Sequence, residues 1–548
     1  MSNWDINCGF LTDKRSLVMA KYGLVNFFAW RPHIDHLHFI YDALKKSSHK
    51  VSLLSCDGSL PTCYDREIKG GSRLQNCMKC TLGGVRSFAS STEVVSLKNF
   101  FDSTINHYEL DCTSTAPTNM CLSSAATIHR LETDLEQAES AVIDTIAKLS
   151  QTTDIVFKSV CNWIKREKIE RVICFNGRVD VTRAVIEACR SLGTPFSTHE
   201  RSWFGPGIQL IYNDNCLSPE PINKINKDFC DVSLSRDQCI AAIRLIAERF
   251  GGQNKIEWRL YNPDRVAAKW PTITTRKRIL VVPSSRNEFM GSDHYQNEWS
   301  ANTEALSLLF GNNDISPSQV VVRGHPNWDE NIGVSEGKRS NIHYTNWCSD
   351  NNIHYIDSSS SLSTYDLIKD ADIVILNGGS SAVEAGVLGK HVVCIGNSWY
   401  RDAKFAQNFL SLSDLKEYKL IDWDLSRFQI ISYTLRYIYN RLTRFPLFTD
   451  QIILKSSTEV LGKEINAWQI DQFFERRGNL VYDELADRDG SDERYFIHSL
   501  LNDFDGLLQF VLKFEHNNDS ELADFMNKKN WWYRLLIGFI GSPSRGDR

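Results

Sequence analysis

The sequence predicts an α/β protein with two successive Rossmann-like domains that face each other across a cleft, followed by a helical C-terminal region. In both halves of the chain, short apolar runs suited to buried parallel strands alternate with amphipathic helical stretches. Between the halves, residues 253–277 combine prolines, aromatic residues and charges, which is typical of a domain boundary. We therefore expect domains over 1–265 and 266–425, with helices over 426–548 that pack back on them.

The composition is that of an ordinary folded protein. Its 548 residues are enough for more than one domain, and 24% are charged and 42% hydrophobic. The net charge of -5 gives no reason to expect nucleic acid as a partner. The N-terminal residues lack an apolar signal core, and no stretch reaches the length of a transmembrane helix. We therefore expect a bacterial cytoplasmic protein in which the fifteen cysteines are reduced.

The first domain opens with a strand, a loop, a helix and a second strand. Leu24–Ala29 and Val51–Ser55 are the strands, and Leu37–Lys46 has helical spacing. Ligands of doubly wound sheets bind at the carboxyl ends of the strands. The loop after the first strand therefore offers candidates for a polar site, although a solvated loop is the commoner explanation. These candidates are Arg31, His33, Asp35 and His36.

A second βαβ unit follows a long helical region. Ser123–Leu149 is expected to form one amphipathic helix and Ile155–Lys168 another. The next strands are Arg171–Phe175 and Pro195–Thr198. Polar clusters follow both strands, with Asn176 and Arg178 after the first and His199-Glu200-Arg201 after the second. Glu200 is a candidate general base, and the alternative is a structural ion pair with Arg178 or Arg201.

Four cysteines lie close together early in the chain: Cys56, Cys63, Cys77 and Cys80. The last pair has the C-x-x-C spacing of zinc sites, but the first pair does not. The spacing is thus compatible with a structural zinc site and also with free or redox-active thiols.

The second domain repeats the pattern of strands that end in polar residues. Arg278–Pro283, Gln319–Arg323 and Asn352–Ile356 are expected strands. The carboxyl ends of parallel strands share one edge of the sheet, so we expect the polar residues after them to converge there. These residues are Ser284, Ser285, Glu288, His325, Ser363, Tyr365, Ser380 and Ser381.

The stretch from Ala371 to Tyr400 predicts a strand, a glycine turn, a helix and a further strand. Ser381 and Glu384 have the S-x-x-E spacing of a capping box. Gly378 and Gly379 permit a tight turn before the helix start, where free N–H groups favour phosphate. The alternative is that any βαβ unit needs such a turn and cap.

The C-terminal region is expected to be mostly helical, with helices over Ser426–Arg441 and Thr458–Arg477. The tail from Asn530 to Gly541 is aromatic and apolar with basic residues beside it. Two interpretations remain open: an interfacial anchor at the inner face of the cytoplasmic membrane, or a helix packed on the core.

Residues 279–400 carry a family resemblance. Arg323-Gly-His325-Pro326, Ser363-Thr-Tyr365 and Gly379-Ser380-Ser381 through Glu384 resemble the paired HP and Ser-Ser motifs of bacterial sialyltransferases and Kdo transferases. These are GT-B glycosyltransferases of capsule and surface polysaccharide synthesis, and teichoic-acid glycerophosphotransferases are similar in the same region. The resemblance implies a GT-B fold and a cytidine-nucleotide donor.

The resemblance also implies roles for individual residues. His325 would contact the donor phosphate, Ser380 and Ser381 would hold phosphate, and Glu384 would contact ribose or base unless it caps the helix. The donor side would further include Ser284, Ser285, Glu288, Arg323, Pro326, Ser363, Tyr365 and Gly379. Candidates on the acceptor side, in the first domain, are Arg31, His33, Asp35, Asn176 and Arg178.

The catalytic base is left open by the resemblance. The sialyltransferases carry an acidic D/E-D-G motif, for which this chain has only Cys56-Asp57-Gly58. Asp57 and Glu200 are the candidates, with Asp35 and Asp180 behind them. Asp370-Ala-Asp372 has the D-x-D spacing of a metal clamp but precedes its strand, at the opposite end from the predicted site. We therefore expect transfer without a metal or other cofactor.

These inferences predict an inverting glycosyltransferase of capsule or O-antigen synthesis. Its donor would be a CMP-linked acidic sugar such as Kdo, and its acceptor a glycan or a lipid-linked oligosaccharide. The alternatives are a polyol-phosphate transferase that uses a donor such as CDP-glycerol, a non-catalytic nucleotide-binding component of a capsule complex, and a nucleotide-sugar epimerase.

Overall fold

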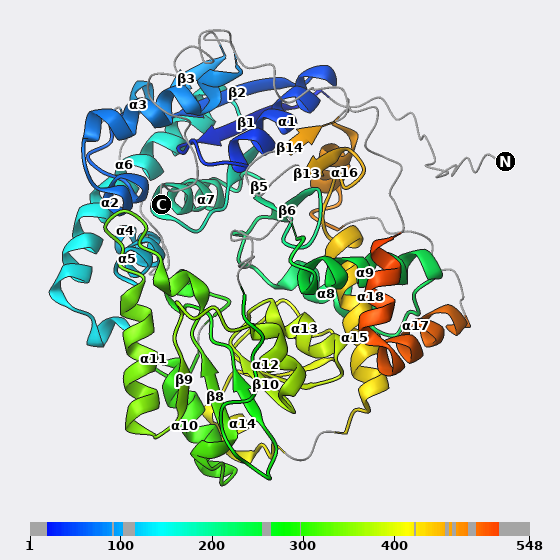
Figure 1. Ribbon diagram of the computed structural model, residues 1–548. Helices are drawn as coiled ribbons and strands as arrows, with labels where there is room; N and C mark the ends of the chain where they lie inside the picture. Colours follow the sequence, from blue (N-terminus) through cyan, green and yellow to red (C-terminus); the bar gives the residue numbers. More distant parts are fainter. Residues whose placement is uncertain are drawn as a thin grey trace, which may run out of the picture.

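The computed structural model contains two α/β domains, the first drawn in blue and cyan and the second in green and yellow (Figure 1). The structure describes residues 19–89, 93–101, 116–254, 265–295, 297–420, 424–454, 460–462, 467–479 and 489–513. The predicted tail segment Asn530–Gly541 lies outside these residues. The expected GT-B-like architecture of two Rossmann-like domains with a helical C-terminal extension is confirmed.

Both domains are built on a six-stranded sheet. The first has the order β3-β2-β1-β4-β5-β6 and is parallel except for β6, which runs antiparallel to β5. The second has the order β12-β11-β10-β7-β8-β9 and is parallel throughout. The strands are β1 Lys21–Asn26, β2 Lys50–Ser55, β3 Val94–Ser96, β4 Arg171–Phe175, β5 Phe196–Arg201, β6 Ile208–Tyr212, β7 Ile279–Val281, β8 Val320–Arg323, β9 His354–Ile356, β10 Ile373–Leu376, β11 His391–Ile395 and β12 Ala406–Phe409.

The strand order places a crevice in each sheet. In each domain, the chain begins with a strand in the middle of the sheet and adds strands toward one edge. It then returns to add strands on the other side. The direction changes between β1 and β4 in the first sheet and between β7 and β10 in the second. Loops diverge at such a switch point, which is where α/β sheets bind ligands.

Helices cover both faces of each sheet. Those of the first domain are α1 His33–Lys46, α2 Tyr64–Lys69, α3 Arg73–Gly83, α4 Pro117–Met120, α5 Leu122–His129, α6 Ser140–Glu167 and α7 Asp180–Leu192. The later ones are α8 Glu220–Phe229, α9 Arg236–Phe250, α10 Asn302–Asn312, α11 Lys338–Asp350, α12 Thr364–Asp370, α13 Ser381–Val387, α14 Leu412–Glu417, α15 Arg427–Tyr439, α16 Trp468–Glu475, α17 Ser491–Asn502 and α18 Phe504–Leu512.

Two helix predictions were wrong. The expected helix Ser123–Leu149 is broken at Arg130, which adopts the left-handed conformation at the C-terminus of α5 with φ 51°. The chain restarts as α6, which runs on to Glu167 and absorbs the expected helix Ile155–Lys168. Only the end of Thr458–Arg477 is helical as α16, because Val460–Gly462 forms strand β14 and pairs with β13, Ile452–Leu454.

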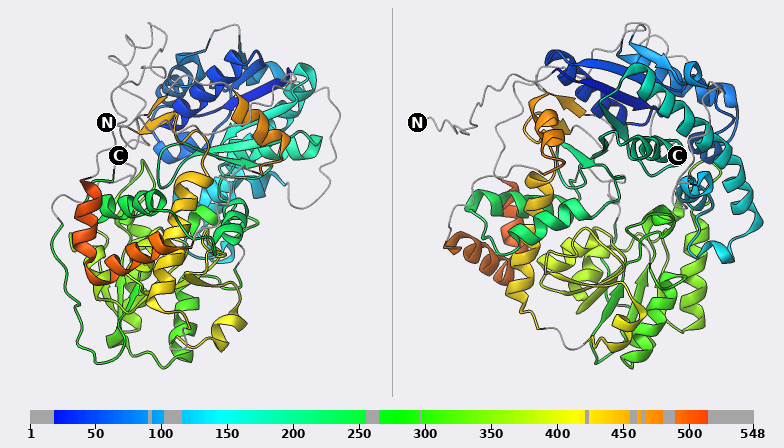
Figure 2. Two further views of the ribbon diagram at one scale, coloured as in Figure 1. Left: turned by 90° about the vertical axis from the view of Figure 1, so that its right-hand side faces the viewer. Right: turned by 180° about the vertical axis from the view of Figure 1, so that it is seen from behind.

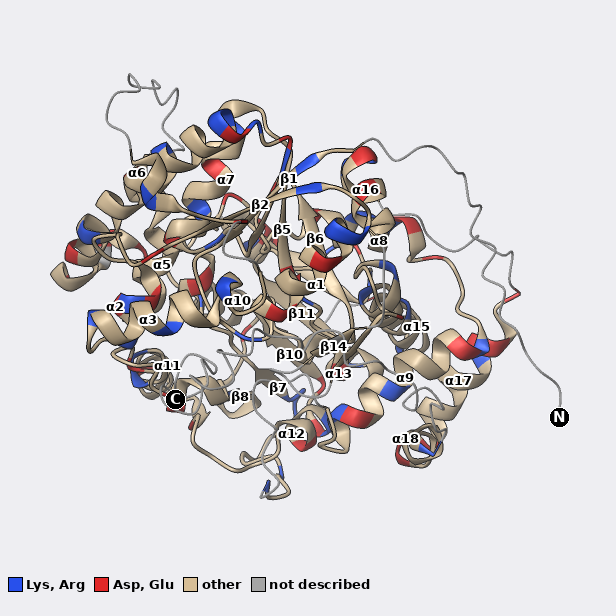
Figure 3. Ribbon diagram, turned by 90° about the horizontal axis from the view of Figure 1, so that it is seen from above, with Lys and Arg blue, Asp and Glu red and all other residues tan. Residues whose placement is uncertain are grey.

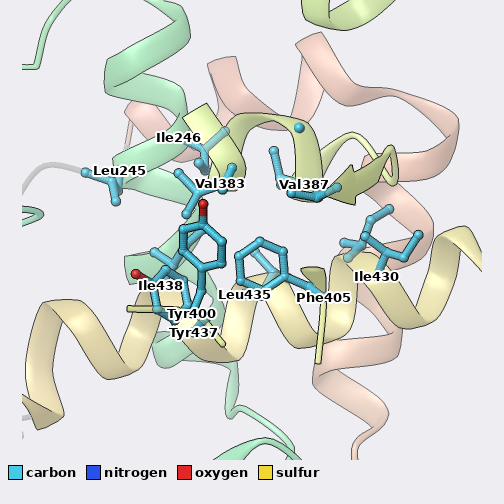
Figure 4. Packing of buried hydrophobic residues seen from close by; sticks show 14 of the residues in the cluster. Leu245, Ile246, Val383, Val387, Tyr400, Phe405, Ile430, Leu435, Tyr437 and Ile438 are labelled. Carbon is cyan, nitrogen blue, oxygen red and sulfur yellow. The ribbon is translucent and has the colours of Figure 1, made fainter. Parts of the chain in front are cut away.

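The packing of the helices crosses the expected domain boundary at residue 265. Helices α8 and α9 precede it, yet their apolar faces share a core with the second sheet and with α13, α15, α17 and α18. Figure 4 shows Ile246 of α9 and Val383 of α13 near Tyr437 and Ile438 of α15. In the other direction, α16 returns to the first sheet and lies beside it in orange, away from α17 and α18 (Figure 2).

A buried carboxyl group joins the two domains. Glu132, from the segment after α5, accepts hydrogen bonds from the Ser340 hydroxyl (2.6 Å), the Arg286 backbone N–H (3.1 Å) and the Asn287 amide (3.2 Å). All three donors belong to the second domain. Complete burial raises the pKa of Glu132 to about 7, although these hydrogen bonds oppose the shift.

Charges of both signs are intermixed on the helices and loops seen from above in Figure 3. Among the residues that the structure describes, no helix has both the length and the apolar character needed to span a membrane.

The domain interface is predicted to lose stability as the pH rises. The pKa of Glu132 is about 7 in the folded state and has an ordinary value of 4.5. The stabilisation from its bound proton is therefore complete below about pH 4.5 and is lost as the pH rises through 7. Glu132→Gln cannot titrate, so the melting temperature of the wild type relative to this variant should fall between pH 5 and pH 8.

The control for this measurement is Glu136→Gln, which changes an exposed residue in the same segment and should follow the wild type. A constant difference between the wild type and Glu132→Gln across this range would contradict the assignment.

Candidate functional site

A cavity of about 290 Å³ lies between the C-terminal edge of the second sheet and the first domain. The ends of β7, β8 and β10 bring several predicted residues together in its wall: Ser284, Ser285, Glu288, His325, Pro326, Gly379 and Ser380. The expected convergence of these residues on one sheet edge is therefore seen in the structure. The first domain contributes Arg201 at the end of β5, followed by Trp203 and Phe204.

The loops that follow β7 and β10 are joined at the switch point between these two strands. The Asn377 amide accepts from the Ser284 backbone N–H (2.6 Å) and donates to the Ser284 carbonyl (2.8 Å). A Cβ atom at Gly379 would lie 2.8 Å from the Ser284 hydroxyl oxygen, so a larger residue there would displace the Ser284 side chain. The turn before α13 is thus held directly against the loop that follows β7.

His325 is oriented by the turn it begins. Its Nδ1 accepts a hydrogen bond from the Asn327 backbone N–H (3.2 Å) at the start of the 3₁₀ helix Pro326–Asp329. The ring proton of the neutral imidazole must therefore lie on Nε2. Trp328 supports the same turn, because its indole N–H donates to the Ser285 hydroxyl oxygen (2.7 Å). His325 thus lies in the cavity wall with its ring proton on Nε2.

Arg441 is one of several cavity residues that sequence reasoning missed. It lies in the π-helical turn Asn440–Arg444 after α15, and it is 1% exposed. Its guanidinium lies 5.2 Å from the ring centre of Trp399 and 5.5 Å from that of Phe204. No carboxylate of the described residues pairs with it, and its Nε has no partner. Burial lowers its pKa, which means that the cavity holds a positive charge at an energetic cost.

A second arginine adds to this charge. Arg130 is 6% exposed, donates from Nε to the Ser335 hydroxyl oxygen (3.1 Å), and has an Nη2 without a partner. Trp203 and Trp399 contact each other beside these cations, with ring centres 4.7 Å apart. The cavity thus combines buried positive charge with aromatic surface, as expected of a site for an anion that carries an aromatic base.

Glu384 does not have the predicted capping role. Helix α13 has Ser380, not Ser381, as its N-cap, and the side chain of Ser380 makes no cap hydrogen bond. Glu384 is buried and instead accepts from Arg249 Nη1 at 2.5 Å. The capping-box prediction was therefore wrong, because the one-residue shift of the helix start leaves Glu384 on the face that packs against α9. This pair neutralises Arg249, which also lines the cavity.

Four other residues predicted for the donor side are not part of the cavity wall. Arg323 is buried and donates to the carbonyls of Gly324, Asp357 and Ser360. Ser363 caps α12 by accepting from the Asp366 N–H, and Tyr365 stacks on Phe250 with ring centres 4.8 Å apart. Ser381 forms the first residue of α13 and does not line the cavity.

Glu200 occupies a buried polar position at the end of β5. Its carboxyl accepts from the Asn176 amide (3.1 Å) and from the Arg201 N–H (3.0 Å), and it lies 3.1 Å from His33 Nδ1. Burial raises its pKa, while these hydrogen bonds oppose the shift. Burial also lowers the pKa of His33 and of His199 to about 3, so both imidazoles are neutral at pH 7.

The remaining first-domain candidates are held in place by other contacts. Arg31 pairs with Asp35 on α1. Arg178 donates to the hydroxyl oxygens of Ser123 (2.8 Å) and Thr127 (3.1 Å), and to the Glu288 carbonyl across the domain interface (3.4 Å). Arg201, the neighbour of Glu200, lines the cavity, but none of the five acceptor-side candidates does: Arg31, His33, Asp35, Asn176 and Arg178.

The other candidate bases differ from Glu200 in their surroundings. Asp57 is exposed on the loop after β2, and although partial burial opposes the shift, hydrogen bonds from Ser59 and Ser96 lower its pKa. Asp180 is fully buried at the start of α7, where burial raises its pKa to about 7, and it accepts from the Tyr64 N–H. Neither residue lines the cavity.

The zinc site suggested by the spacing of the four early cysteines stays a prediction. Among the described residues, which include these four, no three His, Cys, Asp or Glu side chains are arranged to hold a metal ion. All four are free thiols, and the Cys80 thiol donates to Asp65 at 3.4 Å. Burial raises the pKa of Cys63 and Cys80, so both thiols are neutral at pH 7 in the structure described.

Comparison with known proteins gives only distant likenesses. No family model matches the chain, and no curated protein matches its sequence. Among solved structures, a Thermosulfurimonas dismutans KpsC β-Kdo 2,4 transferase is 13% identical over 50% of this chain and 80% of its own, with a TM-score of 0.30.

Two UDP-GlcNAc 2-epimerase structures are similar over more of the chain. The Methanocaldococcus jannaschii enzyme, in complex with UDP-GlcNAc and UDP, is 11% identical over 74% of this chain and 94% of its own, with a TM-score of 0.29. The Neisseria meningitidis enzyme, bound to UDP-GlcNAc, is 13% identical over 77% and 97%, with a TM-score of 0.28. At TM-scores this low, the likenesses carry no argument about function.

Two arginines near the end of α15 are predicted to respond oppositely to replacement. Arg441 is buried without a carboxylate, so Arg441→Met should leave the melting temperature unchanged or raise it. Arg436 donates to both carboxylate oxygens of the buried Glu493, at 2.7 and 3.1 Å. Arg436→Met leaves that carboxylate without its cation and should cost about 3–5 kcal/mol. Thermal and urea unfolding of both variants measure the contrast, and a large loss of stability in Arg441→Met would contradict it.

Proposed function

We propose that the chain is an inverting glycosyltransferase that moves a sugar from a CMP-linked donor to a glycan or lipid-linked acceptor. The observation that carries the proposal is the buried, uncompensated guanidinium of Arg441 beside the Trp203–Trp399 pair in the cleft. A nucleotide complements this cavity, because its phosphate balances the charge of Arg441 and its base packs on the rings of Trp203 and Trp399. The motif resemblance of residues 279–400 supports cytidine as the base and an acidic sugar such as Kdo.

In the proposed reaction, a base removes the proton of an acceptor hydroxyl as its oxygen attacks the anomeric carbon of the donor. The bond from that carbon to the phosphate oxygen breaks on the opposite face, and its electron pair leaves with CMP. His325 Nε2–H, Arg130 and Arg441 stabilise the departing phosphate. Since fixed cations are already present there, we propose that transfer needs no metal ion, and activity should persist in EDTA.

We assign the base to Glu200. A general base works best when its pKa lies near the working pH, and burial moves the pKa of Glu200 in that direction. The hydrogen bonds that hold Asp57 ionised make it a weaker proton acceptor. Glu200 directly precedes Arg201, which lines the cavity, at the end of β5 in the first domain.

A nucleotide panel tests the donor site. We expect CMP to raise the melting temperature by binding the folded state, with smaller effects from UDP and GDP. CDP should also be compared, since a CDP preference with phosphate left on the acceptor would identify a polyol-phosphate transferase instead. His325→Ala should abolish the CMP response, whereas His354→Ala, on the exposed side of β9, should keep it. No response to any of the four nucleotides would contradict the site.

A pair of carboxyl variants tests the base. Glu200→Gln should reduce acceptor-dependent release of CMP from a CMP-linked sugar by about 10²–10⁴-fold while the thermal response to CMP remains. In the wild type, kcat/KM should rise with pH through the raised pKa of Glu200, because only the deprotonated carboxylate accepts the proton. Asp57→Asn should keep normal turnover, and a reversal of the two results would move the role to Asp57.

A further inference from the structure

A second cavity, of about 580 Å³, adjoins the first. Phe289 lines both cavities and stands between them. The second lies where the ends of β10 and β11 meet the loop that follows β7, with Asn119 and Leu122 of the first domain on its other side. None of its lining residues belongs to the sites predicted from the sequence.

The arginines in the wall of this second cavity are already neutralised. Arg286 pairs with Asp134 at 2.7 Å and also donates to the Trp299 and Ser300 carbonyls. Arg183 donates from Nε to Glu187 at 2.8 Å, and its Nη2 lies 3.7 Å from Asp293. The wall therefore offers no uncompensated cation to a ligand, which separates it from the cavity that contains Arg441.

Three uncharged polar atoms of the described wall are instead left without hydrogen-bond partners. Ser292 Oγ, Asn297 Oδ1 and Asn302 Nδ2 are buried atoms that bond to no other protein atom. Ser292 is 8% exposed and Asn302 3%, and the Asn302 carbonyl oxygen is occupied by the Trp299 indole N–H (3.3 Å). Buried polar atoms are almost always hydrogen-bonded, so three orphans in one cavity wall indicate a missing hydrogen-bonding ligand.

The same cavity has an apolar side. The Phe289 and Tyr295 rings pack together with centres 4.2 Å apart, and Leu122 and Ile395 lie in the same wall. A ligand that fits must present apolar C–H surface to these rings and neutral donors and acceptors to the amides and hydroxyl. A sugar ring has both.

We propose that this second cavity binds an uncharged sugar residue of the acceptor. The neutral-sugar chemistry follows from the cavity alone. The assignment to the acceptor rests on the proposed function, because a donor sugar with a carboxylate would find no free cation in this wall.

Saturation-transfer NMR on the full chain tests the proposal with three neutral probes: methyl β-glucoside, methyl β-galactoside and methyl N-acetyl-β-glucosaminide. At least one should bind without nucleotide and should remain bound in saturating CMP. Methyl β-glucuronide, which carries a carboxylate, should bind less. No saturation transfer to any neutral probe would overturn the proposal even if CMP binds, whereas sugar binding without a CMP response would overturn only the nucleotide site.

Two variants locate the binding. Asn297→Leu and Ser292→Ala should each weaken the probe by about tenfold, the loss of one hydrogen bond, without changing the CMP response. Asn351→Leu, at an exposed position after α11, should leave binding unchanged. Unchanged affinity in both cavity variants would place the sugar elsewhere. Displacement of the probe by an intact CMP-linked sugar, but not by CMP, would overturn the acceptor assignment.

Discussion

The position of one buried carboxyl group, that of Glu132, determines how the cleft is built. Its three hydrogen-bond donors come from the loop after β7 and from α11, so the first domain holds the second by the segment that begins at Arg286. That segment carries Glu288 and Phe289, and Phe289 separates the two cavities. A looser hold on this loop would merge the charged cavity with the neutral one.

The two cavities show how similar side chains acquire different roles from their partners. Arg249 and Arg441 line the same cavity and are both buried, but Arg249 lies against Glu384 whereas Arg441 lies against aromatic rings. Of these two arginines, only Arg441 retains a charge that a ligand can neutralise. Arg286 in the second cavity resembles Arg249, because its guanidinium is already paired with Asp134 and donates to backbone carbonyls. The charge of the ligand that each cavity accepts thus depends on whether its arginines are paired with carboxylates. It does not depend on how many arginines the cavity contains.

The fold and the donor-side edge could be predicted because they depend on local pattern. Short apolar runs followed by glycine or polar residues are enough to place Ser284, His325 and Gly379 at the ends of parallel strands. Arg441 could not be found in this way, because it lies in a helical region far along the chain and reaches the cleft only through the return of α15. The only pattern in the sequence around Arg441 is an arginine among aromatic residues after a long helix. Many arginines with a purely structural role show the same pattern. The misassigned Glu384 shows the same limit, since a capping motif and a buried ion pair require the same residue type.

The return of α16 to the first sheet also bears on how the chain is synthesised. Asp471 bonds to Tyr22 (2.6 Å) and His49 (2.9 Å), and Ile470, Phe473 and Phe474 complete the core on that face of the sheet. Most of the chain must therefore be synthesised before α16 can cover this face of the first sheet. Until then its apolar residues are exposed, as in other intermediates of large multidomain chains. Chaperone dependence should accordingly concentrate on the first domain, and a fragment ending at the linker should aggregate although it contains all six strands of its sheet.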